Sequence, residues 1–289
     1  MSWTARFAAL VDRKVAAARA AELWPFTTDA VPHAGDLLPI GNDWSRHFFD
    51  GPFYVSPPPS AELPAVSVVF VQSRDGNTGG GDPAALGGGA TDTHLIYEGL
   101  SRVAADAVVA GADTIRGGDI VLSVWREELI RLRLELGKSR HPVQIVGTLR
   151  GLALDEGLLF NVPDLPVVVM TTGPGFEAMR THLATRPWIT PIVMAHGSDL
   201  MSACRALRRM GIERVSAIGG RTIATAMIDA GVVQDLYLTT SPKSGGEPNT
   251  PLYARPLERE LIVSKHGTGP EAGTLFRHYL LSRGPTPAR

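Results

Sequence analysis

The stretch AVSVVFVQ, residues 65–72, is a continuous apolar and β-branched run that begins directly after Pro64. Shorter runs of the same kind follow it, with helical stretches between them. Runs that are apolar throughout indicate strands covered on both faces, and their alternation with helices predicts an α/β fold with a mostly parallel sheet flanked by helices. The later runs lie at 107–110, 143–146, 167–171, 191–194 and 214–217, and the helical stretches at 92–105, 120–136, 176–184, 199–210 and 222–230.

The C-terminal part of the sequence breaks this alternation. Residues 236–241, 261–266 and 274–281 are typical of strands that follow one another with no helix between them. We therefore expect antiparallel C-terminal edge strands on one side of the sheet, joined by turns rich in glycine and proline.

Single residues mark predicted helix ends. Ser198 precedes the helical stretch 199–210, where its hydroxyl could cap the first turn. Gly211 and Gly231 follow predicted helices, at places where a left-handed residue commonly ends a helix.

Residues 1–63 differ in character from the rest of the chain. Apolar residues recur near the helical period over residues 5–21, with charges about once per turn, which predicts an amphipathic helix and excludes a signal peptide or a membrane span. Prolines and aromatic residues then accumulate over residues 24–64. This composition indicates an extended arm that lies on the main domain or on a partner subunit, and a flexible linker is the alternative. We therefore divide the chain into an N-terminal helix and arm (1–63) and a main domain (64–289).

Charge and cysteine content exclude several classes of function. Lys and Arg number 28 against 29 Asp and Glu, with no long run of either sign, which argues against broad electrostatic binding to nucleic acid or an anionic membrane. Cys204 is the only cysteine, which excludes an internal disulfide and a multi-cysteine metal site and favours a reducing compartment. We expect a cytoplasmic protein that binds a small molecule and holds no metal.

Three turns at predicted strand ends are candidates for ligand binding, because ligands bind at the carboxyl ends of strands in open α/β sheets. The first is SRDG at 73–76, with further glycines at 79–81 and 87–89; its carboxylate, Asp75, is either a substrate-facing group or a turn former. The other two are GADTIR at 111–116 and GGRT at 219–222, and the second of these opens directly onto a helix, whose N-terminus favours a diphosphate. Their candidate cofactor-binding residues are Gly111, Ala112, Thr114, Arg116, Gly219, Gly220, Arg221 and Thr222.

A fourth stretch, GPGFEA at 173–178, imitates the dinucleotide-binding fingerprint of Rossmann proteins. Pro174 removes one amide, however, and the fingerprint normally lies in the first βα unit. Thr171 and Thr172, just before it, could still contact an adenosine ribose or its phosphate.

Together these turns resemble the reductase domain of bacterial bifunctional riboflavin biosynthesis proteins, a family with a dihydrofolate-reductase-like fold. SRDG at 73–76 resembles the family's Ser-Leu-Asp-Gly turn, GADTIR at 111–116 its Gly-x-Gly-Thr-Val-Arg turn, and GGRT at 219–222 its Gly-Gly-Pro-Thr. DLYLTTSP at 235–242 is similar to the strand that follows in the family. The resemblance spans roughly residues 64 to 281.

The resemblance implies a homodimeric, NADPH-dependent reductase that opens the ribose of a pyrimidine ribosylamine phosphate. It implies that the two glycine turns hold NADPH, that Thr171 and Thr172 lie near its adenosine end, and that Asp75 faces the substrate as the catalytic residue. The family's strand lysine and its glutamate before the paired glycines are replaced here by Val69 and Ile218. A pterin or folate-like substrate, a catalytically silent nucleotide-binding protein and a Rossmann-type enzyme therefore remain alternatives.

Overall fold

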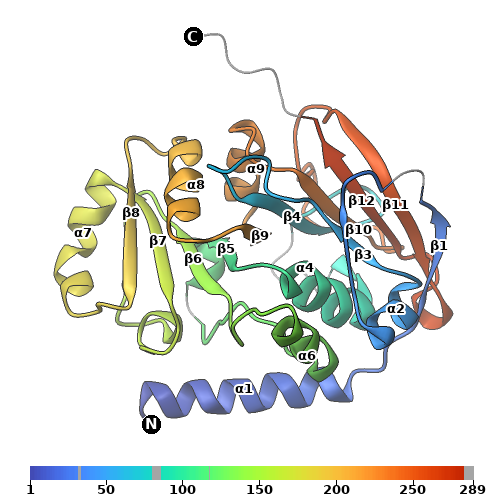
Figure 1. Ribbon diagram of the computed structural model, residues 1–289, viewed down its shortest axis with the longest axis horizontal. Helices are drawn as coiled ribbons and strands as arrows, with labels where there is room; N and C mark the ends of the chain where they lie inside the picture. The colour runs from blue at the N-terminus through green and yellow to red at the C-terminus, as the bar shows by residue number, and fades with distance from the viewer. Residues whose placement is uncertain (32–33, 80–85, 117, 283–289) are drawn as a thin grey trace.

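The computed structural model describes residues 1–31, 34–79, 86–116 and 118–282, and a large twisted sheet runs through them (Figure 1). Its ten described strands have the order β1-β11-β12-β10-β4-β9-β5-β6-β7-β8, and β2 and β3 form a separate hairpin. The strands are β1 (Phe26–Ala30), β2 (Leu38–Ile40), β3 (Phe53–Val55), β4 (Ala65–Gln72), β5 (Ala107–Gly111), β6 (Val143–Gly147), β7 (Val167–Thr172), β8 (Ile189–Met194), β9 (Arg214–Gly219), β10 (Asp235–Thr240), β11 (Arg259–Gly267) and β12 (Leu275–Leu281).

Helices cover both faces of this sheet. They are α1 (Trp3–Ala20), α2 (Asp43–Phe49), α3 (Gly89–Thr91), the π-helix η2 (Asp92–Leu100), α4 (Ser101–Val103), α5 (Ala112–Ile115), α6 (Glu127–Glu135), the 3₁₀ turn η3 (Leu158–Phe160), α7 (Gly173–Ala184), α8 (Leu200–Arg209), α9 (Arg221–Asp229) and the 3₁₀ turn η4 (Gly269–Glu271). The α/β architecture predicted from the sequence is confirmed.

The strands run parallel in the main part of the sheet and antiparallel at its C-terminal edge, as the sequence predicted. From β10 to β8, each neighbouring pair of strands is parallel. The pairs β10–β12, β12–β11 and β11–β1 are antiparallel, which confirms the antiparallel C-terminal edge. The arm adds β1 to the outside of that edge.

Two hydrophobic cores lie on the two faces of the sheet. On one face, α2, η2, α6 and α7 pack against residues such as Val69, Val108 and Ile218. On the other face, α8 and α9 pack against alternate residues of the same strands, such as Val68 and Val109. Because successive side chains of a strand point to opposite faces, a continuous apolar run fills both cores.

The arm packs into the first of these cores. Phe26, Phe49 and Phe53 are buried against Tyr237 and Phe276, in an aromatic cluster with ring centroids 4.6–6.4 Å apart. Burial of aromatic rings supplies a large hydrophobic contribution. The arm also has more regular structure than its prolines suggested, since it contains β1, α2, β2 and β3.

Helix α1 runs along the lower edge of the molecule in Figure 1, below α6. Its apolar stripe, which includes Leu10 and Ala18, packs on Val121, Trp125 and Leu158 in a third small core. In the described part of the chain, no helix has the length and apolarity needed to cross a membrane.

The helix predicted over 120–136 is wrong in its first half, because helix α6 begins at Glu127. The Leu122 N–H donates to the Gln144 side-chain oxygen at 2.8 Å, and the Gln144 amide donates to the Leu122 carbonyl at 3.0 Å. A buried glutamine thus satisfies this stretch of backbone, which removes the need for helical hydrogen bonds.

The predicted Ser198 cap is also wrong. The residue before α8 is Asp199, and the Ser198 hydroxyl lies 2.9 Å from His196 Nδ1. Gly211 and Gly231 have φ of +85° and +65°, which confirms them as left-handed residues after helices.

Candidate active site

Two glycine turns meet at the carboxyl ends of β5 and β9. A Cβ atom added to Gly220 would lie 3.6 Å from the Gly111 nitrogen and 3.6 Å from Thr114 Oγ1. A Cβ on Gly219 would lie 3.2 Å from Thr114 Cγ2. Gly220 has φ of +78°, a conformation that favours glycine. The turns at 111–116 and 219–222 are therefore neighbours in space, as their placement after parallel strands predicted.

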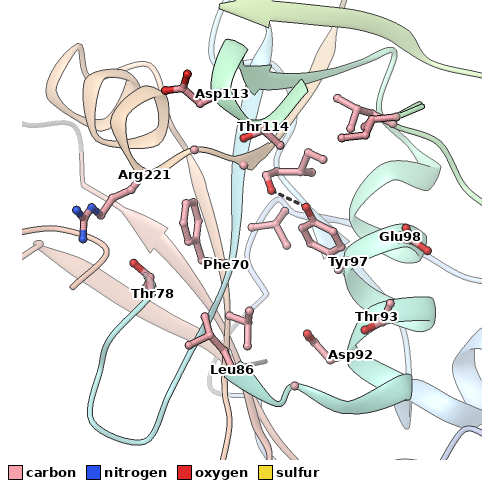
Figure 2. A pocket seen from close by; sticks show the side chains of 18 of the residues that line it. Phe70, Thr78, Leu86, Asp92, Thr93, Tyr97, Glu98, Asp113, Thr114 and Arg221 are labelled. Atoms are coloured by element: carbon pink, nitrogen blue, oxygen red, sulfur yellow. Dashed lines mark hydrogen bonds between the residues drawn. The ribbon is translucent and has the colours of Figure 1, made fainter. Parts of the chain in front are cut away.

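A β-bulge shapes the second turn. The pairing of β5 with β9 shifts register between Val109 and Ala110, which leaves Ile218 as the extra residue. The Ile218 carbonyl accepts a hydrogen bond from the Tyr97 hydroxyl at 2.9 Å, the dashed line in Figure 2. Bulges of this kind often lie next to binding sites, because they redirect the backbone.

The turn at Gly219 and Gly220 leads into α9, whose first turn receives no side-chain cap. Amides at such a helix start carry a partial positive charge and favour an anion. Arg221 and Thr222 are exposed there, and Figure 2 shows Arg221 at the edge of the pocket. The absence of side chains at both glycines keeps the space beside these amides open, so the residues fit a diphosphate.

The turns open into a cleft of about 960 Å³. Strands β4 and β9 pair only as far as Val68 and Ala217, while β4 continues along β10 to Gln72. The carboxyl-terminal half of β4 therefore separates from β9, and Val69, Phe70 and Val71 line the gap. Figure 2 shows Thr114 and Arg221 on one side of this cleft, with Asp92 and Tyr97 on the helix at the other.

Asp92, at the start of η2, is the buried carboxyl of the cleft. It accepts a hydrogen bond from the Thr239 hydroxyl on β10. Burial is the main cause that raises the pKa of Asp92 to about 7, and the nearby Glu271 charge adds to the effect. A carboxyl that titrates near neutral pH can donate or accept a proton at working pH. Asp92 was not predicted from the sequence, because aspartate is common at the start of helices that have no catalytic role.

Tyr97 and Arg102 also line the cleft and lie against each other. The Arg102 guanidinium lies 4.7 Å from the centre of the Tyr97 ring and donates to the Ser123 carbonyl at 2.8 Å. Burial lowers the pKa of Arg102 and raises the pKa of Tyr97. Within the described residues, Arg102 Nε has no hydrogen-bond partner.

The N-terminal helix contributes to the cleft as well. Lys14 of α1 lines it and forms an ion pair of 2.9 Å with Glu98 of η2. Arg6 forms an ion pair with Asp119, another lining residue. Segment 1–63 therefore supplies part of this wall.

The predicted residues divide into two groups. Thr114, Arg116, Gly219, Gly220, Arg221 and Thr222 line the cleft, and so do Val69 and Ile218. Gly111 lies against Gly220, and Ala112 begins α5 beside it. Arg116 is exposed and pairs with Asp113 at 3.1 Å. The structure thus brings the two glycine turns together with both replaced family positions.

Asp75, Thr171 and Thr172 lie outside the lining of this cleft. The Asp75 carboxylate accepts the Gly245 N–H at 2.9 Å, and its catalytic role stays a prediction. Thr171 is buried, and the Thr172 hydroxyl donates to the Leu149 carbonyl at 2.6 Å. Both threonines are at the end of β7, which is separated from β5 by β6. Gly80 and Gly81 of the first glycine loop lie outside the described residues.

The Rossmann-like stretch at 173–178 serves packing. A Cβ on Gly175 would lie 2.7 Å from the Leu149 carbonyl oxygen, so this glycine permits close contact between α7 and the loop after β6. The side chain of Thr172 caps α7. Neither feature faces the cleft, whose described lining residues come from other segments.

The fold and the cleft define an α/β protein with a cleft at the carboxyl edge of a parallel sheet, bounded by two glycine turns and a buried carboxyl. The model of the RibD C-terminal domain family matches residues 64–264, and the chain belongs to this family. The family prediction made from the sequence is confirmed.

Solved structures share the fold. A pyrimidine reductase-like protein from Corynebacterium diphtheriae is 22% identical, with a TM-score of 0.61 over 76% of this chain and 93% of that chain. RibD from Acinetobacter baumannii is 20% identical, with a TM-score of 0.56 over 76% of this chain and 58% of that chain. The riboflavin biosynthesis reductase of Saccharomyces cerevisiae is 14% identical, with a TM-score of 0.51 over 77% of this chain and 91% of that chain. These structures confirm the α/β fold with a mostly parallel sheet and antiparallel edge strands that the sequence predicted, and a comparison with curated proteins found no match.

Proposed function

We propose that this protein is an NADPH-dependent reductase of a small heterocycle, and that the first substrate class to test is a riboflavin-pathway pyrimidine ribosylamine phosphate. The observation that carries the proposal is the contact between the turns at Gly111 and Gly220, at one end of a cleft that holds a buried carboxyl. Membership of the RibD C-terminal domain family supports the same activity.

The cofactor side of the cleft is assigned to the two turns. Backbone amides at the start of α9 and the hydroxyls of Thr114 and Thr222 would bind the diphosphate and ribose oxygens, because they surround the space left by the glycines. Arg116 and Arg221 would add positive charge at the rim. Thr171 and Thr172 remain candidates for the adenosine end. When bound, NADPH supplies hydride to an electrophilic carbon of the substrate.

We assign Asp92 as the donor of the proton that must accompany reduction of the substrate. Asp92 lines the cleft, and the Thr239 hydroxyl bonded to its Oδ1 fixes the carboxyl group, so the group can hold a proton close to a bound heterocycle. Val69 and Ile218 line the same cleft and make this part of its wall apolar. Preorganised placement of this kind lowers a barrier by several kcal/mol, on the order of 7–11 in favourable cases.

A pterin or folate-like substrate is the second candidate. Asp92 favours it, because a buried carboxyl can pair with the adjacent ring N–H and amino group of such a heterocycle. The apolar Val69 and Ile218, where the family usually has charged residues, are compatible with it. A silent nucleotide-binding protein would bind NADPH and reduce neither class.

The test is turnover of NADPH with a panel of pyrimidine and pterin compounds, which is measured as the loss of nicotinamide absorbance. We expect NADPH to be oxidised in the presence of at least one compound, and product analysis to show that this compound has been reduced. Binding of NADPH without turnover of any compound would leave only the silent protein, and absence of NADPH binding would refute the proposal.

We also propose a cytoplasmic homodimer. The buried thiol of Cys204, whose pKa is raised to about 12 by desolvation, is unreactive and consistent with a reducing compartment. Light scattering of the purified chain should give the mass of a dimer, and the mass of a single chain would contradict this assembly.

A further inference from the structure

Glu271, in the turn between β11 and β12, contacts the start of the helix that carries Asp92. The Thr91 N–H donates to Glu271 Oε1 at 3.1 Å. A Cβ on Gly89 would lie 2.6 Å from the same oxygen, so the glycine permits the close approach. The other oxygen, Oε2, is buried and has no hydrogen-bond partner among the described residues.

An unpartnered buried carboxylate oxygen is costly, since desolvation of a charge is compensated only by pairing. Within the described part of the chain, neither Glu271 nor Asp92 forms a salt bridge with a cation. The groups that face Asp92 are the Thr239 hydroxyl on β10, Glu271 on the β11–β12 turn and Tyr97 farther along η2. Two acidic side chains therefore interact here, and neither has an ion pair with a cation among the described residues.

We propose that Glu271 is a positioning residue of the reductase, whose negative charge keeps a proton on Asp92 and whose hydrogen bond to Thr91 fixes the helix start. The proposal rests on the proposed function for its consequence, because Asp92 is the proton donor there. Like-charge neighbours favour the protonated form of an acid. The direction of the Asp92 pKa agrees, since Glu271 raises it in addition to burial.

The helix start has a second anchor, which allows charge and structure to be separated. The Thr91 hydroxyl accepts from the Trp24 N–H at 2.9 Å and donates to the Trp24 carbonyl at 3.2 Å. Glu271→Gln retains an oxygen that can accept the Thr91 N–H and removes only the charge. Glu260→Gln, an exposed position on β11, is the matched control.

Two measurements on the full chain test the proposal. In a carbon-13 NMR titration of aspartate carboxyls, with the Asp92 signal assigned through Asp92→Asn, Glu271→Gln should lower the Asp92 midpoint by about 0.5 pH unit or more. In the pH profile of kcat/KM, the decline on the alkaline side should move to lower pH by the same amount. Glu260→Gln should change neither midpoint.

An unchanged Asp92 midpoint in Glu271→Gln would overturn the proposal, and so would a lower melting temperature with no shift of either midpoint, which would mark a purely structural residue. The NMR titration needs no turnover, so it decides the role of Glu271 even if the reductase activity fails. Normal turnover of Asp92→Asn would instead reject Asp92 as the proton donor.

Discussion

Asp92→Asn should make the protein more stable at alkaline pH and less active. Asp92 is buried and has a pKa of about 7, against 3.8 for an unperturbed aspartate. The difference corresponds to about 4 kcal/mol at 1.36 kcal/mol per pH unit. The expected gain in stability is therefore at most about 4 kcal/mol.

The sign follows from proton binding. The folded chain holds a proton on Asp92 that the unfolded chain loses between about pH 4 and pH 7, so the unfolding free energy of the wild type falls as pH rises through this window. Asparagine does not titrate and can still accept the Thr239 hydroxyl hydrogen bond. The variant should therefore match the wild type near pH 4 and exceed it most above pH 7.

Thermal unfolding at pH 4.5 and pH 8.5 measures this effect. Each kcal/mol of stability shifts the melting temperature by about 2–4 °C in a protein of this size class. The activity of the variant should fall by about 10²–10⁴-fold, the usual contribution of a positioned proton donor. Asp164→Asn, at an exposed site, is the control. An equal difference in melting temperature at both pH values would refute the reasoning, because it would mean that Asp92 is ionised in the folded protein.

Other predictions concern packing and the cleft wall. Phe53→Ala, at a ring that is 1% exposed in the aromatic cluster, should lower the unfolding free energy by about 3–5 kcal/mol in denaturant titrations, and a loss below 1 kcal/mol would show that the arm is not part of the core. Tyr97→Phe removes the donor to the Ile218 carbonyl and should cost about 1 kcal/mol, while an unchanged stability would mean that water replaces the hydroxyl. Lys14→Met should raise KM more than it lowers kcat in steady-state assays, and Arg13→Met should change neither; equal effects of both variants would exclude α1 from the site.

The strands of the main sheet could be predicted because buried parallel strands leave continuous apolar runs. Residues 65–72 coincide with β4, and the other predicted strands differ by at most two residues at either end. The glycine turns could be predicted for a related reason, since glycines at a strand end matter only where a backbone or a ligand approaches closely.

The remaining features depend on contacts that a single sequence does not display. The extended course of residues 120–126 depends on Gln144, whose side chain is brought to Leu122 only by the fold. The raised pKa of Asp92 in η2 arises from its burial in the folded chain, and its hydrogen bond comes from Thr239 on strand β10. Neither cause lies in its neighbours in sequence. The pairing of β1 with β11 joins residues that are more than 200 positions apart.

The most direct test of the central claim is NADPH binding to Gly220→Asp, with Gly211→Asp as the control, because both glycines have a left-handed backbone and Gly211 lies outside the cleft lining. A carboxylate about 5 Å from a phosphate charge, at an effective dielectric constant of about 20, costs about 3 kcal/mol, or more than 100-fold in affinity. Gly211 has no atom within 4 Å of an added Cβ and has φ of +85°, close to the +78° of Gly220, so its variant carries the same backbone cost and should bind NADPH normally. We predict that fluorescence titration shows this loss for Gly220→Asp alone. Wild-type affinity in Gly220→Asp, or an equal loss in Gly211→Asp, would contradict the claim that the turns at Gly111 and Gly220 hold the cofactor.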